Sequence, residues 1–235
     1  MTNPIFAAID TTEIARAQAL AEAIGPYVGG LKLGLEFFLA NGIAGTRAVA
    51  GDRPLFLDLK LHDIPNTVAG GLRAVAALRP ALLTIHASGG AAMMRAAAET
   101  MKGEGGQSRV LGVTVLTSLD EDDLDAVGQR RPVTDQVRRL AALAQASGLD
   151  GVVCSPHEVE ALRADCGPGF LLVVPGIRPE GAASGDQKRT LSPAAAMAAG
   201  ASRLVIGRPI TAAPDPAAAA RAIAESLGAT TGAEG

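Results

Sequence analysis

The sequence has almost no aromatic side chains and very few cysteines. Among its 235 residues there is no Trp, one Tyr, five Phe and two Cys, yet 48% of the residues are hydrophobic. A core of this composition is built from Ala, Val, Leu and Ile, and branched aliphatic residues suit parallel strands covered on both faces. Cys154 and Cys166 have no metal-ligand spacing, and a chain with a full-sized core needs no disulfide. We therefore expect a cytoplasmic protein.

Charge of one sign and long apolar runs are also missing. The 24 acidic and 21 basic residues give a formal net charge of −3. No basic block interleaved with aromatic residues is present, which argues against a nucleic-acid partner. No apolar stretch reaches the roughly 20 residues that cross a bilayer. Met1 is followed almost directly by a strand-like segment, so we expect neither a signal peptide nor a membrane partner.

Short apolar runs alternate with longer Ala- and Leu-rich stretches of helical periodicity. The runs are residues 5–9, 30–33, 55–60, 82–86, 110–116, 151–154, 171–174 and 204–206. Such alternation predicts an α/β fold with a parallel sheet, and eight repeats in a chain of this length favour closure into a barrel. We therefore predict a single (β/α)8 TIM barrel domain over residues 1–228 and a flexible tail over residues 229–235.

The most informative segment is the charged strand Phe56-Leu-Asp-Leu-Lys60. Because side chains alternate along a strand, Phe56, Asp58 and Lys60 share one face and the leucines share the other. The leucine face can pack against helices, and the opposite face then carries Asp58 and Lys60 into the mouth of the barrel, where active sites of this fold lie. Buried charges are costly unless they are paired, so both side chains must belong to a compensated network.

A second lysine is expected beside this pair. Gly30-Leu-Lys-Leu-Gly34 places Lys32 near the end of the neighbouring run, again pointing inward. Lys32, Asp58, Lys60 and Asp63 can then form a row of alternating charges, which would keep Lys60 protonated and ready to donate a proton to a carbanion. The alternative is a structural ion pair at one end of a barrel.

Residues suited to an anion follow the last two runs. These are Arg178, and Gly207 with Arg208, in the loops that often bind phosphate in such barrels. Glycine lets the backbone approach an anion, and the guanidinium fork matches phosphate oxygens. Residues 180–189 are Gly-rich and polar, and we interpret them as a lid in which Gln187 grips the phosphate. The alternative is an ordinary surface loop beside two solvated arginines.

Taken together, these features resemble the bacterial orotidine 5'-phosphate decarboxylase family. Each motif alone is weak, but they occur in family order over nearly the whole chain. The matching motifs are Asp10, the Lys32 segment, Asp58-x-Lys60-x-x-Asp63 with Ile64-Pro-Asn-Thr67, Thr84-Ile-His-Ala-Ser-Gly-Gly90, Leu116-Thr-Ser118, Pro175-Gly-Ile-Arg178, Gly185-Asp-Gln-Lys-Arg189 and Val205-Ile-Gly-Arg-Pro-Ile210.

The resemblance implies conversion of orotidine 5'-monophosphate to UMP and CO2, the last step of pyrimidine nucleotide synthesis, without a metal or cofactor. It implies that Lys60 protonates C6 and that Asp58 lies beside the departing carboxylate and holds Lys60. The remaining roles carried over from the family are ribose binding by Asp10 and Lys32, pyrimidine contact by Thr117 or Ser118, and phosphate binding by Gln187, Gly207 and Arg208, supported by Arg178.

The resemblance also implies a homodimer with active sites shared across the interface, because Asp63 and Thr67 reach into the neighbouring subunit's site in this family.

Two other functions remain open. A related Mg2+-dependent sugar-phosphate decarboxylase or aldolase has a similar charged strand, but it carries a metal-binding carboxylate where this chain has Lys32. A non-catalytic barrel that binds a nucleotide would not need Lys60 beside a buried carboxylate.

Overall fold

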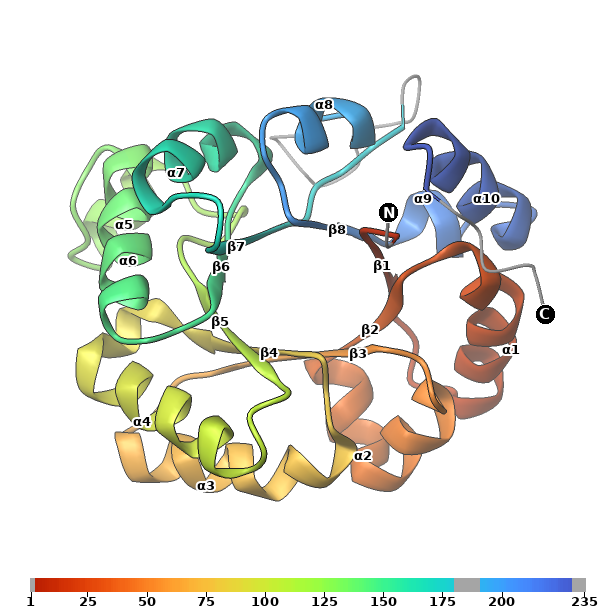
Figure 1. Ribbon diagram of the computed structural model, residues 1–235, viewed down its shortest axis with the longest axis horizontal. Helices are drawn as coiled ribbons and strands as arrows, with labels where there is room; N and C mark the ends of the chain where they lie inside the picture. The colour runs from red at the N-terminus through yellow and green to blue at the C-terminus, as the bar shows by residue number, and fades with distance from the viewer. Residues whose placement is uncertain (1–2, 180–190, 230–235) are drawn as a thin grey trace.

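The computed structural model describes residues 3–179 and 191–229, and these form a closed barrel of eight parallel strands in chain order, in which β8 pairs with β1. Figure 1 looks along the barrel and shows the helices as an outer ring. The strands are β1 (Ile5–Ile9), β2 (Gly30–Gly34), β3 (Leu55–Leu61), β4 (Leu82–His86), β5 (Arg109–Val113), β6 (Gly151–Val153), β7 (Leu171–Val174) and β8 (Arg203–Ile206). The predicted α/β barrel is confirmed.

The helices of the described residues are α1 (Ile14–Ile24), α2 (Leu35–Ala50), α3 (Pro65–Val75), α4 (Gly90–Gly103), α5 (Glu121–Ala126), α6 (Val133–Ala146), α7 (Val159–Cys166), α8 (Pro193–Ala198), α9 (Arg208–Thr211) and α10 (Pro216–Ser226). Single turns of 3-10 helix lie at Gly25–Tyr27, Ala76–Leu78, Ala87–Gly89 and Pro156–Glu158. In these described parts of the chain, none of the helices combines the length and the apolar character needed to span a bilayer.

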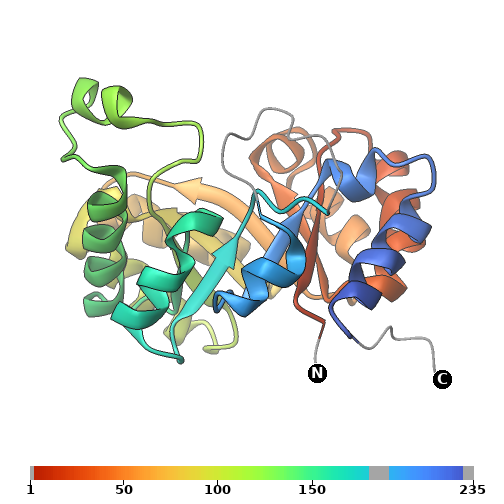
Figure 2. The same ribbon diagram turned by 90° about the horizontal axis from the view of Figure 1, so that it is seen from above.

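One predicted strand is too long. The apolar run over residues 110–116 continues past β5, which ends at Val113. Just beyond β5, Thr114 makes the last contact with β6, because Val153 O accepts hydrogen bonds from both its backbone N–H and its hydroxyl group, at 3.3 and 2.9 Å. Val115 and Leu116 are apolar because they line a pocket, not because they belong to the sheet. The chain then forms an excursion that carries α5 away from the barrel (Figure 2).

The barrel separates two hydrophobic cores. The larger core lies between the strands and the helices and consists mostly of Ala, Val, Leu and Ile. The smaller core fills the barrel interior and contains Phe6, Ala8, Phe56, Leu82, Leu111, Val173 and Val205. The rings of Phe6 and Phe56 meet edge to face with centroids 5.9 Å apart. Phe56, Ala8 and Val205 also line the pocket above, so this inner core forms the pocket floor.

Glycine makes room for the large ring of Phe6. A Cβ atom at Gly30 on the neighbouring strand would lie 2.4 Å from Phe6 Cε1 and 2.5 Å from the carbonyl oxygen of Pro54. Real Cβ atoms do not come this close to backbone, so Gly30 is needed where β1 and β2 pair. Two of the five phenylalanines, Phe6 and Phe56, therefore help to fill the barrel interior.

Candidate active site

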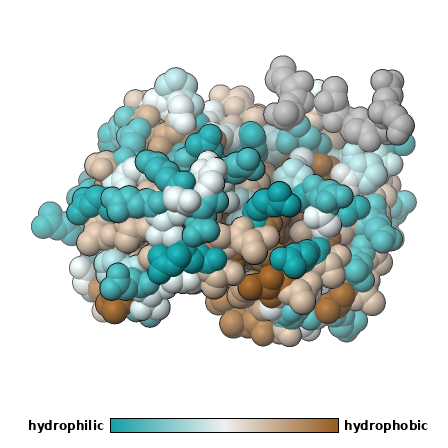
Figure 3. All heavy atoms as spheres, turned by 60° about the horizontal axis from the view of Figure 1, so that its bottom comes forward, coloured by the Kyte–Doolittle hydropathy of each residue, from teal (hydrophilic) through white to brown (hydrophobic). Residues whose placement is uncertain are grey.

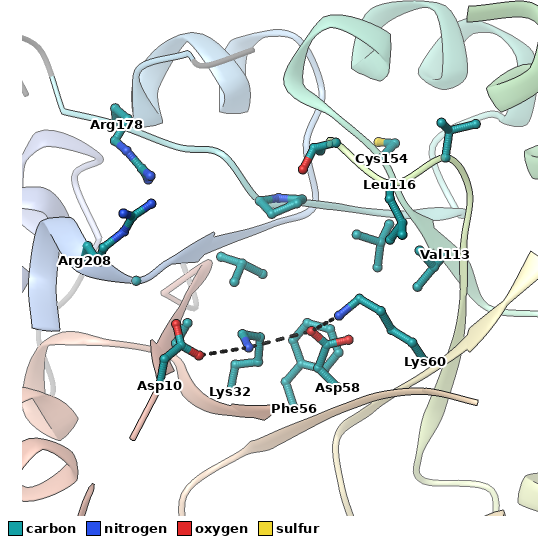
Figure 4. Close-up of a pocket in the computed structure, with 17 residues that line it drawn as sticks. Asp10, Lys32, Phe56, Asp58, Lys60, Val113, Leu116, Cys154, Arg178 and Arg208 are labelled. Atoms are coloured by element: carbon teal, nitrogen blue, oxygen red, sulfur yellow. Dashed lines mark hydrogen bonds and ion pairs between the residues drawn. The ribbon is translucent and has the colours of Figure 1, made fainter. Parts of the chain in front are cut away.

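A pocket of about 480 Å3 opens at the carboxyl ends of the strands. Its charged lining residues come from five places along the chain: Asp10 after β1, Lys32 on β2, Asp58 and Lys60 on β3, Arg178 after β7 and Arg208 after β8. Figure 4 shows these side chains converging on one cavity. In a barrel, residues distant in sequence meet at this end because all strands run in the same direction.

Four charged side chains form a row of alternating sign across the pocket. Lys32 Nζ lies 3.7 Å from Asp10 Oδ1 and 3.7 Å from Asp58 Oδ2, and Lys60 Nζ lies 2.7 Å from the same Asp58 oxygen. The side chains of Lys32 and Asp58 are only 11% and 12% exposed, whereas that of Asp10 is 61% exposed. The row therefore runs from solvent at Asp10 into the pocket (Figure 4).

Asp58 is charged despite its burial. Loss of solvent acts to raise the pKa of its carboxyl group, but the positive charges of Lys32 and Lys60 and hydrogen bonds from Lys60 and Thr84 outweigh it, so the pKa of Asp58 lies below its ordinary value. A buried carboxylate between two ammonium groups is thereby fixed in its ionised form. It holds Lys60 at hydrogen-bond distance inside the pocket.

A bulge in β3 aims the two reactive side chains. Leu57 pairs with Leu83 and Leu61 pairs with Ile85, so Asp58, Leu59 and Lys60 stand opposite the single residue Thr84. Bulges of this kind re-aim side chains and are common near active sites. Lys60 has φ of +50°, in the left-handed region that is costly for a residue with a side chain.

Thr84 is a functional candidate that sequence reasoning missed. It is fully buried, accepts a hydrogen bond from Lys60 N at 2.9 Å and donates one to Asp58 Oδ1 at 2.8 Å. The available sequence signal was a hydroxyl residue inside the apolar run Leu-Leu-Thr-Ile-His. That signal gives no role to Thr84, because the role depends on a bulge in a different strand.

Within a single chain, Asp63 is not part of the charge row. Asp63 is exposed, its carboxylate accepts a hydrogen bond from the backbone N–H of Ile64 at 2.6 Å, and within the described residues it makes no ion pair with Lys32 or Lys60. Asp10 takes the fourth place instead, because β1 pairs directly with β2 and brings it to Lys32. Thr67 is also exposed and does not line the pocket.

The side of the pocket away from Lys60 is cationic. The guanidinium groups of Arg178 and Arg208 point toward one another there (Figure 4). Arg178 is 9% exposed and is held by its own backbone, since its Nη1 donates to Ile177 O at 2.9 Å and its N–H donates to Leu191 O at 3.0 Å. Gly207 joins the lining beside Arg208. Gln187 and the predicted lid lie outside the described residues.

The wall nearest β5 and β6 is mostly apolar. Val113, Val115, Leu116, Val153 and Cys154 line it. Burial raises the pKa of the Cys154 thiol far above its ordinary value, so this side chain is a protonated, uncharged part of the wall. Thr117 lines the pocket at the edge of this wall, whereas the exposed Ser118 does not.

The pocket can therefore hold a molecule with an anion at one end and a group that packs against the apolar wall at the other, next to the ammonium group of Lys60. Three comparisons with known proteins show the family to which the chain belongs. The "Orotidine 5'-phosphate decarboxylase / HUMPS family" matches residues 3–223.

The named relatives cover nearly all of the chain. The orotidine 5'-phosphate decarboxylase of Paramagnetospirillum magneticum is 61% identical and covers 97% of this chain and 100% of its own length. That of Rhodospirillum rubrum is 58% identical, over 96% of this chain and 94% of its own. The crystal structure of orotidine 5'-phosphate decarboxylase from Lactobacillus acidophilus has a TM-score of 0.86 and 38% identity, over 97% of this chain and 100% of that chain. This chain belongs to the orotidine 5'-phosphate decarboxylase / HUMPS family.

Proposed function

We propose that this protein removes CO2 from orotidine 5'-monophosphate to give UMP. The observation that carries the proposal is the ammonium group of Lys60, 2.7 Å from a buried carboxylate, in a pocket whose other end presents two guanidinium groups. The pairing of a proton donor with an anion site matches a phosphorylated substrate that must receive a proton. The names of the 61% and 58% identical relatives point to the same reaction.

In the proposed reaction, the bond between C6 of the pyrimidine and its carboxylate breaks, and CO2 leaves. The electron pair remains on C6, and Lys60 Nζ delivers a proton to that carbon and later regains one from solvent. No cofactor takes up the electron pair, so the fixed charges of Lys32, Asp58 and Lys60 must stabilise it. Such charges are effective when they are held in place, and here Asp58 is in contact with both ammonium groups.

The other lining residues hold the substrate in this proposal. Arg208, Gly207 and Arg178 bind the phosphate, together with Gln187. Asp10 and Lys32 bind the ribose hydroxyl groups. Thr117 contacts the polar edge of the pyrimidine, and its place in the pocket lining favours it over Ser118.

Sugar-phosphate chemistry with Mg2+ is the second candidate, because enzymes of that kind resemble this chain in the charged strand Asp58-x-Lys60-x-x-Asp63. One observation weighs against it. Lys32 Nζ lies between the carboxylates of Asp10 and Asp58, 3.7 Å from each, where a metal ion would have to bind. A fixed ammonium group neutralises these two ligands and repels a divalent cation.

The reaction is tested with purified protein, orotidine 5'-monophosphate and excess EDTA, by following pyrimidine absorbance and CO2 release. We expect UMP formation at a rate that EDTA does not change. Turnover of a sugar phosphate with Mg2+, and none of the nucleotide, would assign the protein to the second candidate. Binding of UMP without turnover of either substrate would indicate a non-catalytic barrel.

We further propose a homodimer in which Asp63 and Thr67 of each subunit complete the partner's site. Both residues are exposed after the end of β3, one on either side of the exposed hydrophobic residue Ile64. Ile64 is 68% exposed, Leu39 74% and Leu35 47%. Figure 3 shows hydrophobic residues gathered at the lower edge of the face that α2 and α3 form. Exposed apolar patches of this kind mark interfaces.

Hybrid dimers test the sharing of sites. Lys60→Ala and Asp63→Ala subunits are each expected to be nearly inactive alone. If the sites are shared, a hybrid dimer holds one intact site, and an equal mixture should regain up to about a quarter of wild-type activity. An inactive mixture in which hybrids are shown to form would contradict the shared site.

A further inference from the structure

We infer that Thr84 is a positioning residue for the proposed decarboxylation, and that its hydroxyl group fixes Asp58 relative to Lys60 across the β3 bulge. The inference rests on the proposed function and adds a residue from a neighbouring strand. Thr84 does not line the pocket, so it acts through Asp58 and Lys60 and not by touching the substrate.

The first support is the register of β3 and β4. Three residues of β3 face one residue of β4, so the backbone groups of the bulge cannot all pair with β4 in the regular ladder. Lys60 N–H instead bonds the side chain of Thr84, with a distance of 2.9 Å to Oγ1. The hydroxyl group therefore replaces a ladder bond at the residue that carries the ammonium group.

The second support is the direction of the two hydrogen bonds. A hydroxyl group has one proton to donate, and Thr84 donates it to Asp58 Oδ1 at 2.8 Å while accepting from Lys60 N. The other carboxylate oxygen of Asp58 accepts from Lys60 Nζ at 2.7 Å. Asp58 is therefore bound on one side by the side chain of Lys60 and on the other by a hydroxyl group that also holds the Lys60 backbone.

The third support is the backbone of Lys60. Its φ of +50° is unfavourable for a residue with a side chain and persists only where the surroundings hold it. Thr84 is 0% exposed, so water cannot take the place of its hydroxyl group. Removing that group would leave the Lys60 N–H without its acceptor and one Asp58 oxygen without its donor.

The test compares four proteins with orotidine 5'-monophosphate as substrate: wild type, Thr84→Val, Thr84→Ser and Thr46→Val. Valine has nearly the shape of threonine but no hydroxyl group, and serine keeps the hydroxyl group. Thr46 is the matched control, because it is also 0% exposed and its Oγ1 donates to Gly42 O at 2.8 Å, but it lies on α2 outside the pocket.

We expect Thr84→Val to lower kcat by about 10- to 100-fold, the effect of two unsatisfied buried groups on a transition state. KM and the affinity for UMP should stay within about threefold, because no residue that binds the nucleotide is changed. Thr84→Ser should keep most of kcat, and Thr46→Val should match wild type. If Thr84→Val does not fold, Thr84→Ala is compared with Thr84→Ser in the same way.

Wild-type kcat in Thr84→Val would overturn the inference, and so would an equal loss of kcat in Thr84→Ser. A parallel loss of kcat and UMP affinity would also overturn it, because that result indicates general damage to the pocket. These outcomes are separate from failure of the proposed function, which would appear as absence of turnover in the wild-type protein.

Discussion

Asp58 is the residue on which the site depends, because one buried carboxylate holds both lysines. Its carboxylate is 3.7 Å from Lys32 Nζ and 2.7 Å from Lys60 Nζ. The sequence pattern predicted the inward face of Asp58 and Lys60 and the presence of Lys32 beside them. It did not place Asp10 in the row and gave no role to Thr84, because both depend on how β1 and β4 lie beside the charged strands.

Because Asp58 is ionised in the folded protein, we expect the stability of the fold to depend on pH. Its pKa lies below the ordinary value of 3.8, since the two ammonium groups and two hydrogen bonds outweigh the effect of burial. The charged form therefore adds stability above that pH, and the contribution is lost as the pH falls through the lowered pKa. We expect the melting temperature of wild type to fall more than that of Asp58→Asn between about pH 5 and pH 2. Parallel curves from calorimetry would contradict this assignment.

The site is assembled by the ends of the strands and by the loops that follow them. The strand limits for β1, β4 and β7 follow directly from the apolar runs, because a parallel strand buried on both faces has few polar residues. The run over residues 110–116 misled the prediction, since its last apolar residues line the pocket. The bulge in β3 has no recognisable signal in an alternating strand pattern, so the left-handed Lys60 could not be foreseen.

Arg208, in the segment after β8, allows a test of whether binding the phosphate contributes to catalysis at Lys60. Arg208 lies on the side of the pocket away from Lys60, so Arg208→Ala removes no reacting group (Figure 4). If phosphate binding helps to organise the site, the variant loses kcat as well as affinity, with kcat/KM lower by about 100-fold or more. Arg203→Ala, at the start of β8 and outside the pocket lining, is the matched control. Steady-state kinetics with an unchanged kcat/KM for Arg208→Ala would exclude the phosphate role.

At the scale of the whole molecule, the barrel is complete in one chain but leaves hydrophobic residues exposed at its mouth. The composition and the alternation of apolar runs with helical stretches predicted the barrel. Eight strand–helix units in a chain of this length have few other ways to bury their strands. The same patterns could not indicate which helix faces meet a second subunit. The proposed interface is indicated instead by the exposure of Leu39, Ile64 and Leu35.

The exposed patch makes a prediction about assembly. Leu39 is 74% exposed on α2, and Leu39→Glu should place a charge in the proposed interface. We expect sedimentation analysis to show a shift from dimer to monomer and kinetics to show a matching loss of activity at low protein concentration. Leu143→Glu is the matched control, since Leu143 is 37% exposed on α6, which lies across the ring from α2 in Figure 1. A fully active monomer would contradict the shared site.

The central claim is that Lys60, held by Asp58, donates the proton that replaces CO2. The most direct measurement is kcat/KM for orotidine 5'-monophosphate in Lys60→Ala, with Lys102→Ala as a surface control. We expect Lys60→Ala to lose about 1,000-fold or more, because it removes both the acid and a charge of the preorganised row, while UMP still binds. Turnover by Lys60→Ala close to the wild-type rate would contradict the account.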